Sequence, residues 1–176
     1  MVKIILLVVG GFIALLLIVA AIMKKEYTIS SEIVINKPKA EVFNFLKNIK
    51  NQEKYSKWVM ADPNVKLTYT GTDGTVGFIS AWDSQDKNVG AGAQEIMKIT
   101  EGEQIDMELR FEKPFKMVSK AVTTTESVGE NQTKYTNTFF AKSPYPLNIM
   151  YPIMKKMLGK DMDETSANLK KLLEKN

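Results

Sequence analysis

The chain has 176 residues, with 24 Lys and Arg against 20 Asp and Glu and with neither histidine nor cysteine. That length suits one domain of ordinary size and a short additional segment. The missing residue types exclude histidine-dependent catalytic triads, cysteine or histidine metal sites and disulfides, so we expect no metal and no cofactor. The net charge of +4 comes from lysines that alternate with carboxylates, with Arg110 as the single arginine. This pattern is typical of a solvated surface and predicts no nucleic-acid partner.

Residues 4–23 form an apolar run of 20 residues, preceded by Lys3 and followed by Lys24 and Lys25. As a helix the run would span about 30 Å, the thickness of the bilayer core. It predicts a single-pass transmembrane anchor over residues 1–25. The alternative is a signal peptide cleaved after residues 19–21 (VAA), although such peptides have apolar regions of about 7–15 residues. The lysines after the run place the following domain in the cytoplasm by the positive-inside rule.

Residues 26–176 contain no linker or repeat and are expected to form one domain. A strand over about residues 27–35 is followed by a helix that opens at Asn36-Lys37-Pro38, and by a short helix over residues 51–58. Six strands then follow, over about residues 65–70, 76–83, 92–100, 104–112, 115–127 and 133–141. A long helix over residues 148–174 ends the chain, with a possible bend at Gly159. This order predicts an α+β fold with an antiparallel sheet.

Several stretches occur in an order that resembles the SRPBCC superfamily, which is START-like and of the polyketide cyclase/dehydrase and lipid-transport type. They are IVINKPKAEVF (33–43), YSKW (55–58), GTDGTVG (71–77), LRFEKPF (109–115) and NLKKLLE (168–174). The resemblance implies a helix-grip fold, in which a curved seven-stranded antiparallel sheet wraps a long C-terminal helix. In many relatives an elongated apolar cavity lies between the two. It implies no particular activity, because this fold hosts carriers, enzymes and sensors.

Strand alternation and helical spacing nominate the residues that would line such a cavity. The expected lining residues are Trp58, Phe78, Ser80, Trp82, Met107, Leu109, Phe111, Met117, Ser119, Thr123, Tyr135, Asn137, Phe139, Ile153, Met154 and Met157. Large apolar groups mixed with a few hydroxyls and an amide are typical of ligand pockets. Dense packing of the same residues into a closed core is the alternative.

Catalysis would need converging ionisable groups with tuned pKa values. Glu95 is the one carboxylate that one strand register points inward, whereas the opposite register points Gln94 and Ile96 inward. No second group pairs with Glu95 in the sequence, so we expect no catalytic residue.

We therefore expect a membrane-anchored, non-catalytic domain that binds a hydrophobic small molecule or a lipid. The alternatives are a cyclase/dehydratase-like enzyme acting on a hydrophobic substrate, and a protein-interaction or stress-response module. Nothing in the sequence predicts an oligomeric state.

Overall fold

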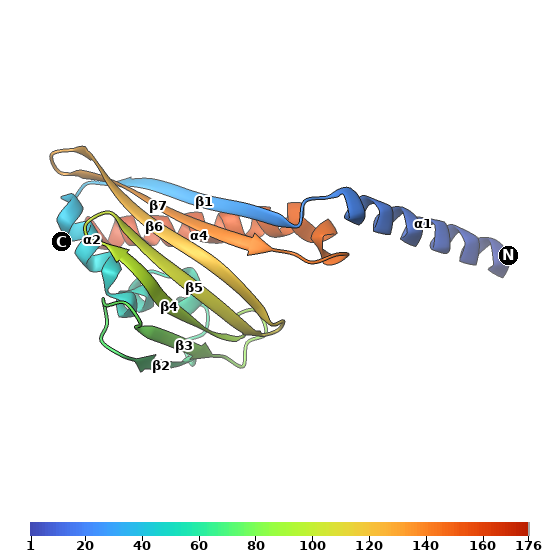
Figure 1. Ribbon diagram of the computed structural model, residues 1–176, viewed down its shortest axis with the longest axis horizontal. Helices are drawn as coiled ribbons and strands as arrows, with labels where there is room; N and C mark the ends of the chain where they lie inside the picture. Colours follow the sequence, from blue (N-terminus) through green and yellow to red (C-terminus); the bar gives the residue numbers. More distant parts are fainter. Residues whose placement is uncertain (176) are drawn as a thin grey trace.

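The computed structural model describes residues 1–175 and contains one sheet, one long C-terminal helix and one N-terminal helix that extends away from them (Figure 1). The strands are β1 (Glu26–Ile35), β2 (Lys66–Thr70), β3 (Ile79–Asp83), β4 (Ala91–Thr100), β5 (Gln104–Lys113), β6 (Met117–Gly129) and β7 (Gln132–Lys142). The helices are α1 (Val2–Ile22), α2 (Lys39–Lys47), the 3₁₀ helix η1 (Ile49–Lys54), α3 (Lys57–Met60), the 3₁₀ helix η2 (Leu147–Met150) and α4 (Tyr151–Leu173).

The seven strands form one antiparallel sheet in the order β1-β7-β6-β5-β4-β3-β2. Neighbouring strands from β2 to β7 follow one another along the chain, with longer loops over residues 71–78 and 84–90 and short turns between the later strands. β1 closes the order by pairing with β7 from Glu26 opposite Lys142 to Ile35 opposite Thr133. The predicted seven-stranded antiparallel sheet is confirmed.

A bulge in β4 decides the register that the sequence left open. The pairing with β5 shifts between Ile96 and Lys98, and Ile96 is buried under the sheet while Gln94 also points inward. Glu95 therefore points to the outer face, where its carboxylate forms an ion pair with Arg110 at 2.8 Å. The register that would have placed Glu95 inside the fold is wrong.

The long helix α4 lies along the concave face of the sheet, and the short helices cover the remaining gap (Figure 1). The core between these layers is built from apolar side chains of α2, α4 and the strands, including Ile35, Phe43, Ile105 and Leu169. The helix predicted over residues 51–58 is two separate pieces, η1 and α3. α4 runs without interruption through Gly159.

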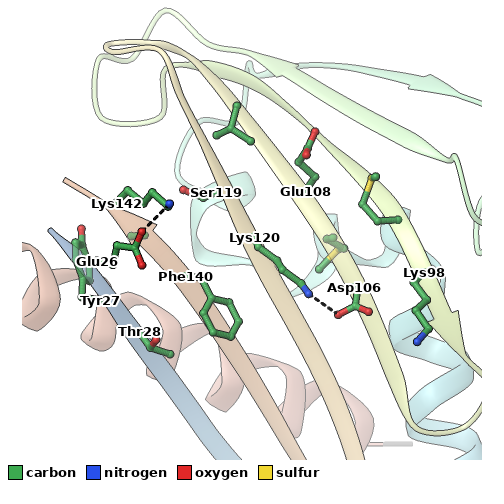
Figure 2. A pocket seen from close by; sticks show the side chains of 14 residues that line it. Glu26, Tyr27, Thr28, Lys98, Asp106, Glu108, Ser119, Lys120, Phe140 and Lys142 are labelled. Atoms are coloured by element: carbon green, nitrogen blue, oxygen red, sulfur yellow. Dashed lines mark ion pairs between the residues drawn. The ribbon is translucent and has the colours of Figure 1, made fainter. Parts of the chain in front are cut away.

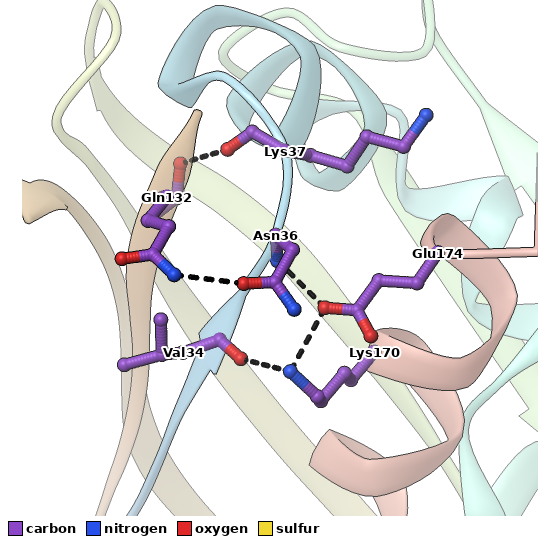
Figure 3. A network of polar contacts seen from close by, with 7 residues as sticks. Val34, Asn36, Lys37, Gln132, Lys170 and Glu174 are labelled. Carbon is purple, nitrogen blue, oxygen red and sulfur yellow. Dashed lines mark hydrogen bonds and ion pairs between the residues drawn. The ribbon is translucent and has the colours of Figure 1, made fainter. Parts of the chain in front are cut away.

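A network of polar contacts fixes the C-terminal end of α4 to the turn between β1 and α2 (Figure 3). The backbone N–H of Asn36 donates to Glu174 Oε1 at 2.6 Å, and Lys170 Nζ donates to the carbonyl of Val34 at 2.5 Å. Lys170 also pairs with Glu174 at 2.8 Å. From the sheet side, Gln132 Nε2 donates to Asn36 Oδ1 at 3.0 Å. This end of the domain is therefore closed by hydrogen bonds between the helix and the sheet.

The helix α1 is apolar along its whole length, with a mean hydropathy of 3.2, and nearly all of its side chains are exposed. A buried core helix would have neighbours on several faces, and this one has contacts only at its C-terminal end. Its length and composition are sufficient for a membrane span, and its position near the N-terminus also fits a signal sequence. Together, the remaining elements form the helix-grip α+β fold that the sequence predicts.

Candidate functional site

A cavity of about 310 Å³ lies between the concave face of the sheet, α4 and the short helix α3. Ten of the residues nominated from the sequence line it: Trp58, Ser80, Trp82, Met107, Leu109, Phe111, Thr123, Tyr135, Asn137 and Phe139. All of them except Trp58 come from strands, because side chains at alternate positions share one face of a strand. The structure thus brings together most of the strand residues of the nominated set.

Six nominated residues do not line this cavity: Phe78, Met117, Ser119, Ile153, Met154 and Met157. Phe78 is buried closer to α2, where its ring stacks on Tyr69 with 5.9 Å between centroids. Ser119 is buried, and Met117 lies half-buried at the start of β6. Phe78 and Ser119 are therefore core residues.

Two of the three nominated residues of α4, Ile153 and Met157, were placed on the wrong face of the helix, whereas Met154 lies one turn before Leu158 on the inward face. Ile153 is 61% exposed and Met157 is 51% exposed, and Met154 is half-buried. The helix instead turns Leu158, Met162 and Thr165 toward the cavity. These positions follow the spacing of three or four residues that one helix face requires, and they are rotated by about one residue from the expected stripe.

Sequence analysis missed the residues that short helices and turns bring to the cavity. Tyr55 and Ser56 lie between η1 and α3, and Gln52 Oε1 accepts a 2.7 Å hydrogen bond from Gln94 of β4. The remaining lining residues that were missed are Val59, Val65, Leu67, Asn88, Val89, Lys113 and Pro114. The YSKW stretch, which carries the nominated Trp58 and part of the family resemblance, was the one local signal for this wall.

The helix α3 carries Trp58 and is fixed to α4 by its first residue. Lys57 Nζ pairs with Asp161 at 2.9 Å and with Glu164 at 2.5 Å, and its backbone N–H donates to Thr165 Oγ1 at 3.2 Å. The hydrogen bonds that Lys57 donates to Glu164 and Asp161 raise the pKa of Lys57 above its ordinary value. These contacts hold Trp58 at the edge of the cavity.

The polar side chains of the lining are uncharged except for one lysine. Ser80, Thr123 and Asn137 project from three different strands of the otherwise apolar wall. The side-chain oxygen Oδ1 of Asn137 is buried and has no hydrogen-bond partner within residues 1–175. A buried acceptor without a donor costs free energy. A ligand with a hydroxyl or N–H group would remove this cost.

The lining contains no aspartate or glutamate, and its one cation is Lys113, whose Nζ lies 3.1 Å from Asp83 Oδ1. Its two tyrosines, Tyr55 and Tyr135, are buried, and burial raises the pKa of both phenols above the ordinary value. Both phenols therefore stay protonated at neutral pH and are poor general bases. The wall is suited to holding a neutral, mostly apolar molecule.

The buried tyrosines predict a loss of stability in alkali. Above about pH 10 the phenols of the unfolded chain ionise while the raised pKa keeps them neutral in the fold, so the free energy of unfolding falls by about 1.4 kcal/mol per tyrosine per pH unit. Tyr135→Phe should reduce this fall, as measured by urea denaturation at about pH 8 and about pH 11. The exposed Tyr145 provides the control, because Tyr145→Phe should leave the fall unchanged. Equal falls in all three proteins would contradict the prediction.

A second hollow, of about 560 Å³, lies on the outer face of the sheet (Figure 2). Two of its three lysines are paired with carboxylates of neighbouring strands: Lys142 with Glu26 at 2.6 Å and Lys120 with Asp106 at 3.5 Å. The exposed Lys142–Glu26 pair contributes little energy. This hollow is lined in large part by charged residues of the outer sheet face, and the cavity between sheet and helix, with its more apolar wall, is the better candidate site.

No group of three or more carboxylates within residues 1–175 is placed to hold a metal ion. Asp161 and Glu164, which lie one helical turn apart, instead bind Lys57.

Comparisons with solved structures find the same fold at low sequence identity. Norcoclaurine synthase from Thalictrum flavum, solved with dopamine and hydroxybenzaldehyde, aligns over 86% of this chain and 88% of its own, with 11% identity and a TM-score of 0.61. Protein MLL2253 from Mesorhizobium loti aligns over 85% and 98%, with 13% identity and a TM-score of 0.62. Ara h 8.0201 aligns over 86% and 99%, with 14% identity and a TM-score of 0.56. At these identities the likeness shows the fold alone.

A search of curated protein sequences finds no significant match. The family described as polyketide cyclase/dehydrase and lipid transport matches residues 26–174, from the first residue of β1 to the end of α4. This match confirms the resemblance on which the sequence analysis relied. The chain therefore belongs to the polyketide cyclase/dehydrase and lipid transport family.

Proposed function

We propose that this protein is a membrane-anchored binding protein for a neutral hydrophobic small molecule or lipid, with residues 1–25 as the anchor and residues 26–176 as the binding domain. The observation that carries the proposal is the cavity between the sheet and α4, whose wall is mostly apolar, lacks carboxylates and contains Asn137 Oδ1, which has no partner within residues 1–175. Family membership supports the ligand class, because the family includes lipid-transport proteins. A non-catalytic role is supported by the raised pKa values of both buried tyrosines.

Native mass spectrometry of the full chain, released from detergent micelles after mild extraction from its own membranes, tests the binding half of the proposal. We expect a reproducible bound mass on the wild-type protein. Ala121→Phe should abolish it, because Ala121 lines the cavity and a phenyl group there fills the space. Val122→Phe is the matched control on the adjacent residue of β6, which does not line the cavity and should keep the bound mass. A wild-type protein that stays free of ligand after incubation with a membrane lipid extract would overturn the proposal.

The anchor half of the proposal is supported by the exposed apolar helix α1 and by the lysines at its end, which favour a cytoplasmic domain. Extraction of membranes with alkaline carbonate should leave the full-length chain in the membrane fraction. The intact mass of that chain should include residues 1–25. A mass that corresponds to a chain beginning after Ala21 would identify α1 as a cleaved signal peptide instead.

A further inference from the structure

The point where α1 joins the domain lies at one end of the sheet. The strand register places the turns that border the cavity at this same end. β1 begins where β7 ends, at Glu26 opposite Lys142, and β5 ends where β6 begins, at Phe111 opposite Met117. In Figure 1 the β5–β6 turn, the start of α4 and the start of β1 all lie at the end of the domain from which α1 leaves. The polar network of Figure 3 closes the opposite end.

The helix α1 is joined to this end by specific hydrogen bonds as well as by the chain. Asn148 of η2 is fully buried, and its Nδ2 donates to the carbonyls of Ala20 at 2.6 Å and Met23 at 3.1 Å. The backbone N–H of Ser143 donates to the carbonyl of Lys25 at 2.8 Å. Carbonyls in the last turn of a helix lack partners within the helix, and Asn148 satisfies that need. The end of the domain is thereby held against the point where α1 ends.

Large apolar side chains are exposed at this end, and we call them the apolar rim. The rim consists of Phe115, Leu147, Met150, Ile153 and Met157. Phe115 is 75% exposed and follows Pro114, which lines the cavity. Met157 precedes Leu158, which lines the cavity from the helix side. The rim thus stands beside the cavity both on the β5–β6 turn and on α4, and exposed apolar groups gathered in this way mark an interaction surface.

Lysines accompany the rim. Lys116 follows Phe115, and Lys155 and Lys156 lie between Ile153 and Met157. Within residues 1–175 none of these three lysines has a carboxylate within ion-pair distance. Apolar side chains interspersed with unpaired lysines match a bilayer surface that carries anionic lipids.

We infer that the apolar rim inserts into the surface of the bilayer that α1 crosses, so that the cavity faces the lipid and exchanges its ligand directly with it. The inference rests on the proposed function, because α1 defines the bilayer. The direct exchange spares a hydrophobic ligand the passage through water, which disfavours exposed apolar surface. The rim residues of α4, which do not reach the cavity, receive a role as membrane contacts.

The chain has no cysteine, so a single introduced cysteine carries a unique label. The full chain is reconstituted into vesicles of phosphatidylcholine and phosphatidylglycerol, with the environment-sensitive dye NBD attached at Phe115→Cys or at Met157→Cys. We expect a blue shift of the NBD emission at both positions and loss of that emission when the vesicles contain nitroxide-labelled lipid. Val128→Cys is the matched control. Val128 is exposed beside the β6–β7 turn, at the opposite end of the sheet, so its label should show neither effect.

The outcomes separate this inference from the proposed function. The chain can float with the vesicles and retain its bound mass while the labels at Phe115 and Met157 behave like the label at Val128. That result would overturn the insertion of the rim and leave the proposed function standing. A chain that fails to float with the vesicles overturns the anchor, and the rim with it. Circular dichroism of each labelled protein checks that the fold is retained.

Discussion

Leu169→Ala is expected to lower the free energy of unfolding by about 2–5 kcal/mol, a large part of the total stability of a domain of this size. Leu169 has an exposure of 0% and lies in the core cluster with Ile35 and Phe43, where α4 meets the sheet and α2. Removing its branched end leaves a void that rigid neighbours fill only in part, so the cost includes both lost burial and the cavity. Equilibrium denaturation in urea measures the change.

The matched control lies on the same helix. Ile153→Ala removes a comparable aliphatic group from a position that the structure exposes, so its cost in the absence of a membrane should stay within about 0.5 kcal/mol. Equal losses from Leu169→Ala and Ile153→Ala would show that α4 presents a different face to the sheet. The pair therefore tests the helix register as well as the magnitude.

The register of α4 shows what the sequence conceals. Ile149, Ile153 and Met157 recur at intervals of four and favour an inward stripe, yet Ile153 and Met157 are exposed, and α4 buries the polar Thr165 and Ser166 beside Met162, Leu169 and Leu173. Ser166 Oγ forms a hydrogen bond of 2.8 Å with Ser31 Oγ of β1 and another of 2.9 Å to a carbonyl of its own helix. Paired hydroxyls of this kind are stable in a core. In the sequence they resemble solvent-facing residues, because the partner is 135 positions away.

The strands were predictable for the opposite reason. Alternation in residues 104–112 depends only on the two faces of a strand, so Met107, Leu109 and Phe111 were assigned to the inner face from local pattern alone. The loop residues at the cavity, such as Asn88 and Val89 between β3 and β4, have no such pattern, and only the fold brings them there. The orientation of Glu95 depends on the neighbouring bulge, which the local alternation does not specify.

Gly92→Ala is expected to destabilise the domain by about 1–3 kcal/mol and to reduce ligand binding. A Cβ at Gly92 would lie 2.5 Å from the carbonyl oxygen of Arg110 and 2.7 Å from Cζ2 of Trp82. The Arg110 oxygen belongs to the backbone of β5, so it moves only if the two strands separate. The ring of Trp82 lines the cavity, packs edge-on against Phe111 and donates from Nε1 to the Val89 carbonyl at 3.3 Å. The added methyl therefore displaces a cavity wall.

Urea denaturation gives the stability change of Gly92→Ala, and native mass spectrometry of the full chain gives the fraction with bound ligand. Gly159→Ala is the control, because its Cβ would meet Ile29 Cγ2 at an ordinary contact distance of 3.7 Å. Alanine is favoured over glycine inside a helix by up to about 1 kcal/mol, so this variant should be more stable than the wild type. Glycine-to-alanine substitution is therefore expected to lower the stability at Gly92, where the β5 backbone crowds the new methyl group, and to raise it at Gly159, where the methyl group fits at an ordinary contact distance. A neutral Gly92→Ala with unchanged ligand binding would mean that Trp82 does not pack over Gly92 in the folded protein.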